Sequence, residues 1–168
     1  MLTADEIISI LNLKPHPSEG GFYVETYRSD ERLSGSVLPQ RYQGPRSFGT
    51  AIYYLLTPDA FSELHRLPTD EVFHFYLGDP VEMLQLAPDG SGKVLRLGTD
   101  IQNGESPQLV VPRGVWQGSR LIAGGRFALL GATMAPGFDF ADYEPGHRAE
   151  LMESYPVFKE MIVALTNE

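Results

Sequence analysis

Cysteine is absent from the chain, which excludes a disulfide framework, a thiolate zinc site and a cysteine nucleophile. Positive charge is scarce, because 13 lysine and arginine residues face 22 acidic residues and leave a net charge of −9. A nucleic-acid partner requires a basic face, and an anionic membrane surface attracts basic segments. The composition therefore argues against both partners, while a local basic pocket for an anionic small molecule stays open.

Long apolar runs are also missing. No window of the sequence approaches the roughly 20 apolar residues that a membrane-spanning helix needs. The N-terminal segment carries Asp5 and Glu6 where a signal peptide would carry basic residues. We therefore expect a soluble, cytoplasmic protein, which is compatible with the lack of cysteine. The length of 168 residues and the 42% hydrophobic content predict a single domain over residues 1–168.

Short strands separated by turns dominate residues 20–135. Aromatic and β-branched runs predict strands near 22–27, 47–57, 71–77, 81–86 and 126–135. Turn residues such as Asn103-Gly104 lie between such runs. This regular spacing of short strands is typical of an all-β sandwich or barrel.

Both ends of the chain are predicted to be helical. Thr3 and Glu6 form a capping-box pattern ahead of an apolar helix face. Residues 146–166 are predicted as two helical pieces broken before Pro156, and we expect them to cover an open end or an edge of the sheet. The polar stretch 28–49 is interpreted as a loop or a lid.

The stretch SELHRLPTDEVFHFYLGD, residues 62–79, has the spacing of half a metal site. It resembles the first motif of the cupin superfamily, in which two histidines two residues apart precede a glutamate and then a glycine. His65, Leu67, Glu71 and Gly78 occupy those places. The second cupin motif leads from Pro-x-Gly to a third histidine, and Gln117 stands in its place.

Four separated segments sharpen this resemblance: EGGFYVETYRS, LHRLPTDEVFHFYLG, VPRGVWQG and APGFDF. Together, from about Glu19 to Tyr143, they resemble the small family called cupin-five, which has no assigned function. The resemblance implies a double-stranded β-helix, or cupin jelly roll, usually assembled as a homodimer. It does not imply a particular reaction.

The metal ligands of this motif are depleted. Leu67 has no ligating atom, and Gln117 is a poor ligand for the transition metals that cupins hold with imidazoles and a carboxylate. We expect no cofactor and no tightly bound metal. If a metal does bind, its ligands are expected to be His65, Glu71 and Gln117.

His65 and Glu71 are instead predicted to be a catalytic acid–base pair. Strand alternation directs Glu71, Phe73 and Phe75 to the inner face and His74 to the other. An apolar surrounding raises the pKa of a carboxyl toward neutrality, where it can exchange protons with a neighbouring imidazole. The alternative is that His65 and Glu71 only bond each other and neighbouring backbone in a leftover polar cavity.

Other side chains complete the predicted site. Gln117, Phe73 and Phe75 are predicted to contact the ligand, and Arg28 and Arg46 are predicted to bind a phosphate or carboxylate at the rim, unless they are merely solvated.

The outlying residues have simpler predictions. Trp116 is predicted to pack in the core or in a dimer interface, and His16 is predicted to lie on the surface.

These residues favour small-molecule binding, or metal-independent isomerase or epimerase chemistry, on a sugar or nucleotide-like ligand. Metal-free cupins such as the dTDP-sugar epimerases transfer protons within this barrel, which is an analogy of fold alone. One alternative is a non-catalytic ligand-binding or storage-type cupin. Another is a metal-dependent cupin enzyme with a degenerate ligand set.

Overall fold

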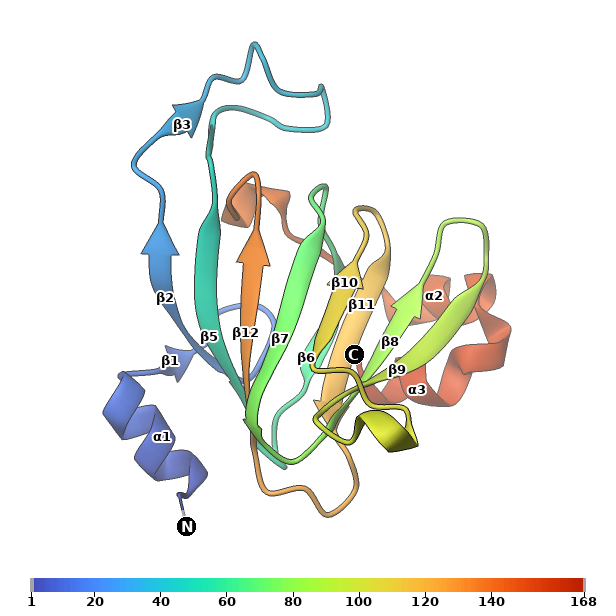
Figure 1. Cartoon of the computed structure of the whole chain (residues 1–168). Coiled ribbons are helices and arrows are strands. Elements are labelled where there is room, and N and C mark those ends of the chain that lie inside the picture. Colours follow the sequence, from blue (N-terminus) through green and yellow to red (C-terminus); the bar gives the residue numbers. More distant parts are fainter. Residues whose placement is uncertain (1, 168) are drawn as a thin grey trace.

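In the computed structural model, which describes residues 2–167, two antiparallel sheets face each other across the core (Figure 1). In spatial order, the six-stranded sheet contains β1 (Lys14–Pro15), β2 (Phe22–Arg28), β5 (Thr50–Leu56), β12 (Ala128–Met134), β7 (Glu71–Gly78) and β10 (Gln108–Val111). The five-stranded sheet contains β13 (Glu144–Pro145), β6 (Ser62–Arg66), β11 (Trp116–Leu121), β8 (Val81–Leu86) and β9 (Gly92–Leu97). This arrangement confirms the predicted all-β jelly roll.

Strand alternation explains why the sheets face each other. The buried residues between them come from both sheets and include Tyr54, Phe73, Met83, Leu121 and Leu130. Burying a side chain of this size contributes about 1.5–3 kcal/mol each. Because this core fills only part of the space between the sheets, other residues of β5, β6, β7 and β12 border an open cavity.

The N-terminal helix α1 (Ala4–Leu11) begins at the predicted capping box. The Thr3 hydroxyl accepts the backbone N–H of Glu6 at 3.3 Å, and the Glu6 carboxylate accepts that of Thr3 at 2.8 Å. The helix ends at Asn12, whose φ of 54° is left-handed, rather than at the prolines that follow. Its apolar side packs on Leu55 and Leu129, on the outer face of the six-stranded sheet.

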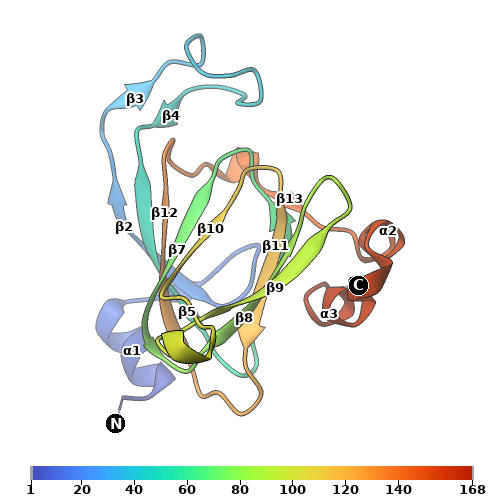
Figure 2. The same ribbon diagram turned by 45° about the vertical axis from the view of Figure 1, so that its right-hand side comes forward.

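The C-terminal helices cover a sheet face instead of the predicted end or edge. They comprise α2 (Arg148–Ser154), the 3-10 turn η3 (Pro156–Phe158) and α3 (Lys159–Ala164). Figure 2 shows them on the outer side of the sheet that contains β8, β9 and β11. The reason is that β8 is apolar on both faces, with Met83 inward and Leu84 and Leu86 against the helices. No helix within residues 2–167 is long and apolar enough to cross a membrane.

The stretch 28–49 forms a loop with a two-stranded ribbon, β3 (Arg32–Leu33) and β4 (Arg46–Ser47), which extends beyond the sheets (Figure 1). Short 3-10 turns, η1 (Ile101–Asn103) and η2 (Phe140–Asp142), complete the regular structure. The segment that contains η2 lies beside the base of this loop and is bonded to it through Arg46 and Asp142.

A tight Gly20-Gly21 turn feeds the chain into β2. Gly20 has a φ of 92°, and a Cβ atom there would lie 2.3 Å from the carbonyl oxygen of Phe61. The buried Tyr54 hydroxyl donates to the Gly20 carbonyl at 2.8 Å. Backbone and hydroxyl therefore hold this turn against the barrel, which fixes where the preceding residue, Glu19, points.

We predict that Gly20→Ala destabilises the protein far more than Gly90→Ala. Both positions have a left-handed φ, 92° and 88°, but a Cβ at Gly90 meets nothing within 4 Å. The conformation alone costs about 1–2 kcal/mol, so Gly90→Ala isolates that cost and Gly20→Ala adds the collision. Urea denaturation measures both. Equal losses of stability would show that the close approach to Phe61 does not constrain the turn.

Candidate functional site

A cavity of about 380 Å³ opens where the two sheets diverge, a volume typical of a small-ligand site. Its lining combines seven titratable side chains with apolar and aromatic walls. It is lined by Lys14, His16, Glu19, Tyr23, Val24, Glu25, Thr50, Ile52, His65, Leu67, Glu71, Ala132, Met134, Phe138 and Phe140. Lys14, Glu25 and Phe140 are exposed and mark its mouth.

Glu71 is the first residue of β7 and reaches across to the opposite sheet. Its carboxylate accepts a hydrogen bond of 2.5 Å from the side-chain amide of Gln117 on β11. Burial, and next the nearby charge of Glu19, raise the pKa of Glu71 to about 7. Glu71 therefore exchanges its proton near neutral pH, and Gln117 holds the carboxyl in place.

His65 on β6 lies in the same cavity and is 1% exposed. Its Nδ1 donates to the backbone carbonyl of Glu63 at 2.7 Å, because a carbonyl oxygen can only accept. The other nitrogen, Nε2, then holds a lone pair and lies 3.8 Å from Glu19 Oε1. Burial lowers the pKa of His65, so the imidazole is neutral and basic at pH 7.

Glu19 and His16 belong to the site, although the sequence reasoning missed the first and assigned the second to the surface. The His16 side chain is 4% exposed, so that assignment is wrong. His16 Nδ1 accepts the backbone N–H of Glu19 at 3.0 Å, which leaves its Nε2–H facing Glu19 Oε2 at 3.4 Å. The Gly20-Gly21 turn folds this loop back over the cavity, and burial raises the pKa of Glu19.

Glu19 thus lies between two imidazoles, His16 and His65, and also accepts the Ser62 hydroxyl at 2.9 Å. Glu71 bonds Gln117 rather than His65, so the alternative of a mutual His65–Glu71 bond does not describe this arrangement. Tyr143 stacks on His65 with ring centroids 5.0 Å apart and closes it from one side. The sequence signal for Glu19 was its place directly before the paired glycines.

Phe73 and Phe75 were predicted to contact the ligand, but the structure packs them in the core between the sheets and not in the cavity wall. They point inward, as alternation predicts, and His74 points to the other face, where its Nε2 lies 3.0 Å from the Thr133 hydroxyl. The sheets converge along β7, so inward residues beyond Glu71 meet core side chains instead of open space.

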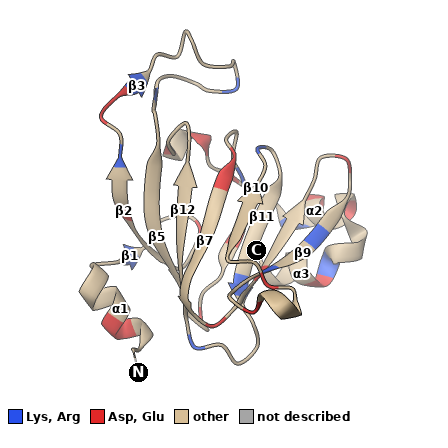
Figure 3. Cartoon of the chain, in the orientation of Figure 1, with Lys and Arg blue, Asp and Glu red and all other residues tan. Residues whose placement is uncertain are grey.

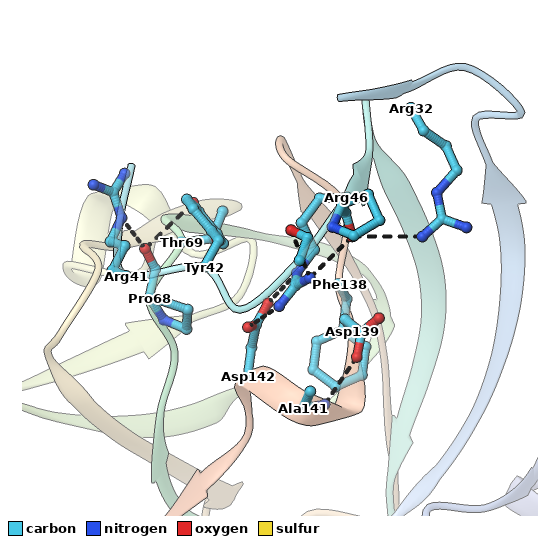
Figure 4. Close-up of polar contacts among 12 residues, drawn as sticks. Arg32, Arg41, Tyr42, Arg46, Pro68, Thr69, Phe138, Asp139, Ala141 and Asp142 are labelled. Carbon is cyan, nitrogen blue, oxygen red and sulfur yellow. Dashed lines mark hydrogen bonds and ion pairs between the residues drawn. The ribbon is translucent and has the colours of Figure 1, made fainter. Parts of the chain in front are cut away.

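Arg28 and Arg46 are not free to bind an anion as predicted. Arg28 bonds both carboxylate oxygens of Glu25 at 2.8 Å, and it also donates to the Phe138 carbonyl. Arg46 is 3% exposed and bonds Asp142 at 2.8 and 2.5 Å (Figure 4). The Arg28 bond to the Phe138 carbonyl and the Arg46–Asp142 pair fasten the 28–49 loop to the segment that contributes Phe138 and Phe140 to the cavity.

The residues at the metal-ligand positions do not fit a metal. Leu67 offers no ligating atom, and the Gln117 amide N–H groups point at Glu71. Within residues 2–167, no group of three or more histidine, cysteine, aspartate or glutamate side chains is arranged to hold a metal ion. The motif leaves only His65 and Glu71, which is short of the three protein ligands typical of catalytic sites.

Comparison with known proteins places this chain in a family. Residues 5–145 match the Cupin_5 model, described as cupin superfamily (DUF985). The chain belongs to the Cupin_5 family. This Cupin_5 protein is 34% identical over 134 residues to the uncharacterised protein YML079W of Saccharomyces cerevisiae, a match over 74% of this chain and 66% of that protein.

Solved structures support the same assignment. A hypothetical protein from Leishmania major has a TM-score of 0.89 and 32% identity, with 99% of this chain and 100% of that chain covered. Protein SO0799 from Shewanella oneidensis has a TM-score of 0.86 and 35% identity, with 99% of each chain covered. Bacillus subtilis oxalate decarboxylase, at a TM-score of 0.53, 15% identity and coverage of 92% and 37%, shares the fold alone.

We predict that Glu71→Gln changes the pH dependence of stability. The unfolded chain loses the Glu71 proton near pH 4.5, whereas the folded state keeps it to about pH 7. Between these values only the folded state binds the proton, so Glu71 lowers the free energy of unfolding as pH rises. The loss is on the order of 3 kcal/mol and is complete above pH 7. Glutamine removes it and still offers Gln117 an acceptor.

Urea denaturation in steps from pH 4.5 to 8 measures this difference. The raised pKa of Glu19 acts in the same direction, and the lowered pKa values of His16 and His65 act oppositely below pH 6.5. The difference between wild type and Glu71→Gln therefore reports the titration of Glu71 together with its effect on Glu19 and His65. Glu82→Gln, on the outer face of β8, is the matched control. Parallel curves for wild type and Glu71→Gln would contradict the assignment.

Proposed function

We propose that this Cupin_5 protein binds a small, sugar-like or nucleotide-like ring compound and moves a proton on it without a metal, as an isomerase or epimerase does. The observation that carries the proposal is the coexistence in one cavity of a basic His65 Nε2 and a Glu71 carboxyl that is partly protonated at pH 7. Environments that move the pKa values of two neighbouring groups in opposite directions provide an acid and a base at one pH.

In this proposal His65 removes a proton from a carbon next to a carbonyl group. The electron pair of the broken C–H bond forms a C=C bond as the carbonyl π electrons pass to the oxygen, and Glu71 donates its proton to that oxygen, which gives an enediol when the first carbon carries a hydroxyl. His65 then returns its proton to the former carbonyl carbon while Glu71 takes the proton of the neighbouring hydroxyl, so the carbonyl group moves by one carbon and both side chains regain their starting protonation. Glu19, 3.8 Å from His65 Nε2, stabilises the imidazolium formed on the way.

A second candidate function is binding without chemistry, as in a storage-type cupin. The apolar walls favour it, because Val24, Ile52 and Met134 surround a ligand without reacting with it. The two candidates differ in whether the bound compound exchanges hydrogen with solvent.

We predict that a compound that stabilises the protein also exchanges a carbon-bound hydrogen for deuterium in its presence. A thermal-shift screen of monosaccharides, nucleosides and sugar nucleotides identifies the compound, and proton NMR in D2O follows the exchange. His65→Ala and Glu71→Gln should each slow exchange by about 100-fold or more, because each removes a proton-transfer group.

His147→Ala and Glu82→Gln, which remove the same groups far from the cavity, are the controls and should exchange normally. Exchange that survives in both cavity variants would refute the acid–base proposal. Binding to wild type without any exchange would favour the second candidate.

We also propose that the protein is a homodimer that pairs through the outer face of the six-stranded sheet. Tyr76 and Val110 lie on this face and are 47% and 51% exposed. Trp116, predicted to pack in the core or in a dimer interface, lies beneath Arg66 and against the apolar cluster under the C-terminal helices, apart from this face. Large apolar side chains exposed on one sheet face favour a twofold interface.

We predict that light scattering at tens of micromolar, roughly the usual working range for such interfaces, gives the mass of a dimer. Tyr76→Lys combined with Val110→Lys should give a folded monomer, because two cations would then face their copies across the twofold axis. Val94→Lys with Val157→Lys, two exposed positions elsewhere, is the control. A wild-type monomer would exclude the dimer.

A further inference from the structure

We propose that the compound bound in the cavity is an organic cation, a small ring compound that carries a protonated amine. This inference rests on the proposed function of the same cavity and names the chemical class of its ligand. It follows from the charges that face the cavity, from the aromatic side chains around them and from the ion pairs that the nearby arginines form.

The charge inside the cavity is negative or neutral. Glu19 and Glu71 face the interior, while both imidazoles, His16 and His65, are neutral because burial lowers the pKa of each. The cationic member of the lining is Lys14, which is exposed at the mouth beside Glu25. A phosphate inside the cavity would therefore meet two carboxyl groups and no buried cation.

The arginines near the cavity cannot reverse this balance. Arg28 is occupied by Glu25 and Arg46 by Asp142, in bidentate pairs that already satisfy their charge. Basic residues elsewhere are dispersed over elements such as β1, β3 and β9 instead of forming one face (Figure 3). The ring compounds that fit best are therefore those without phosphate groups in the buried part.

Aromatic rings complete a site suited to a cation. Tyr23 and Phe140 lie around His16, with ring centroids at 4.6 and 6.1 Å, and Phe138 packs edge-on against Phe140 at 5.0 Å. Ring faces carry negative electrostatic potential and attract ammonium groups, more strongly where water is excluded. Carboxyl groups at the floor and aromatic rings at the mouth are the elements that recognise an amine.

A bound ammonium group would also relieve the electrostatic conflict between the two carboxyls. Burial, and next the charge of Glu19, raise the pKa of Glu71 against the smaller lowering effects of His65 and Gln117. An amine binds the ionised form of Glu71 more tightly than the protonated form, so binding favours release of the Glu71 proton, and the proposed proton transfer proceeds from the complexes in which Glu71 keeps it. Amine affinity should therefore rise as pH increases through 7, whereas the affinity of a neutral compound should not.

The test compares benzylamine, benzyl alcohol and benzoate, which share a ring and differ in charge, by ligand-observed NMR titration of the wild-type protein. Benzylamine should bind about tenfold or more tightly than benzyl alcohol, since a hydrogen bond to a charged group is stronger than one between neutral groups. Benzoate should bind most weakly. From pH 6 to pH 8 the benzylamine affinity should rise up to about tenfold, as Glu71 ionises.

Glu71→Gln should abolish the preference for benzylamine over benzyl alcohol and the pH dependence, and Phe138→Ala should weaken both compounds. Glu82→Gln should change neither. Benzoate binding as tightly as benzylamine, absence of binding by all three probes, or a preference unchanged in Glu71→Gln would each overturn the cation assignment. The deuterium-exchange test is independent: exchange lost in Glu71→Gln with no amine preference would reject the ligand class and retain the proposed chemistry.

Discussion

The burial of carboxyl groups between two apolar sheets is the constraint on which this site depends. A charged carboxylate loses most of its hydration in such a place, so it must find donors, keep a proton or attract a cation. Glu71 combines the first two, through the Gln117 amide and a pKa raised to about 7. Glu19 relies on the Ser62 hydroxyl and on an imidazole at either side. The Glu71–Gln117 bond links the two sheets, because Glu71 lies on β7 and Gln117 lies on β11.

The register of the strands makes these contacts possible. Gln117 is paired with His65 between β11 and β6, while Glu71 faces them from the first position of β7. A shift of one residue in β6 or β11 would turn these side chains to the helix-covered face. There the C-terminal helices and residues such as Leu64 and Leu84 form a closed apolar layer. The same packing that stabilises the five-stranded sheet therefore also keeps the polar residues pointing into the cavity.

Much of the fold could be predicted because it rests on local patterns. The capping box of α1, the strand runs and the inward direction of Glu71 follow from neighbours in the sequence. Motif spacing identified His65, Glu71 and Gln117 as residues that converge, and the family match now supports the fold in which they do so. Their roles, in contrast, depend on partners that spacing does not specify.

The errors have physical reasons. Alternation gives the face of Phe73 but not its depth, so it could not tell a cavity wall from the core. Arg46 looked like a rim cation because its partner, Asp142, lies 96 residues further along the chain. His16 looked exposed because proline and glycine signal a loop without saying where the loop returns.

The Arg46–Asp142 pair has a consequence for how the chain tolerates changes in length. Both side chains are almost fully buried, 3% and 4% exposed, so separating them would leave an unpaired charge in the interior. An insertion beside Val37, which is 68% exposed between β3 and β4, leaves this pair in place and adds only surface. An insertion beside Arg46 or Asp142 displaces the aromatic segment that follows β12. Loop length can therefore vary freely at one end of the ribbon, while at the other it sets the shape of the ligand cavity.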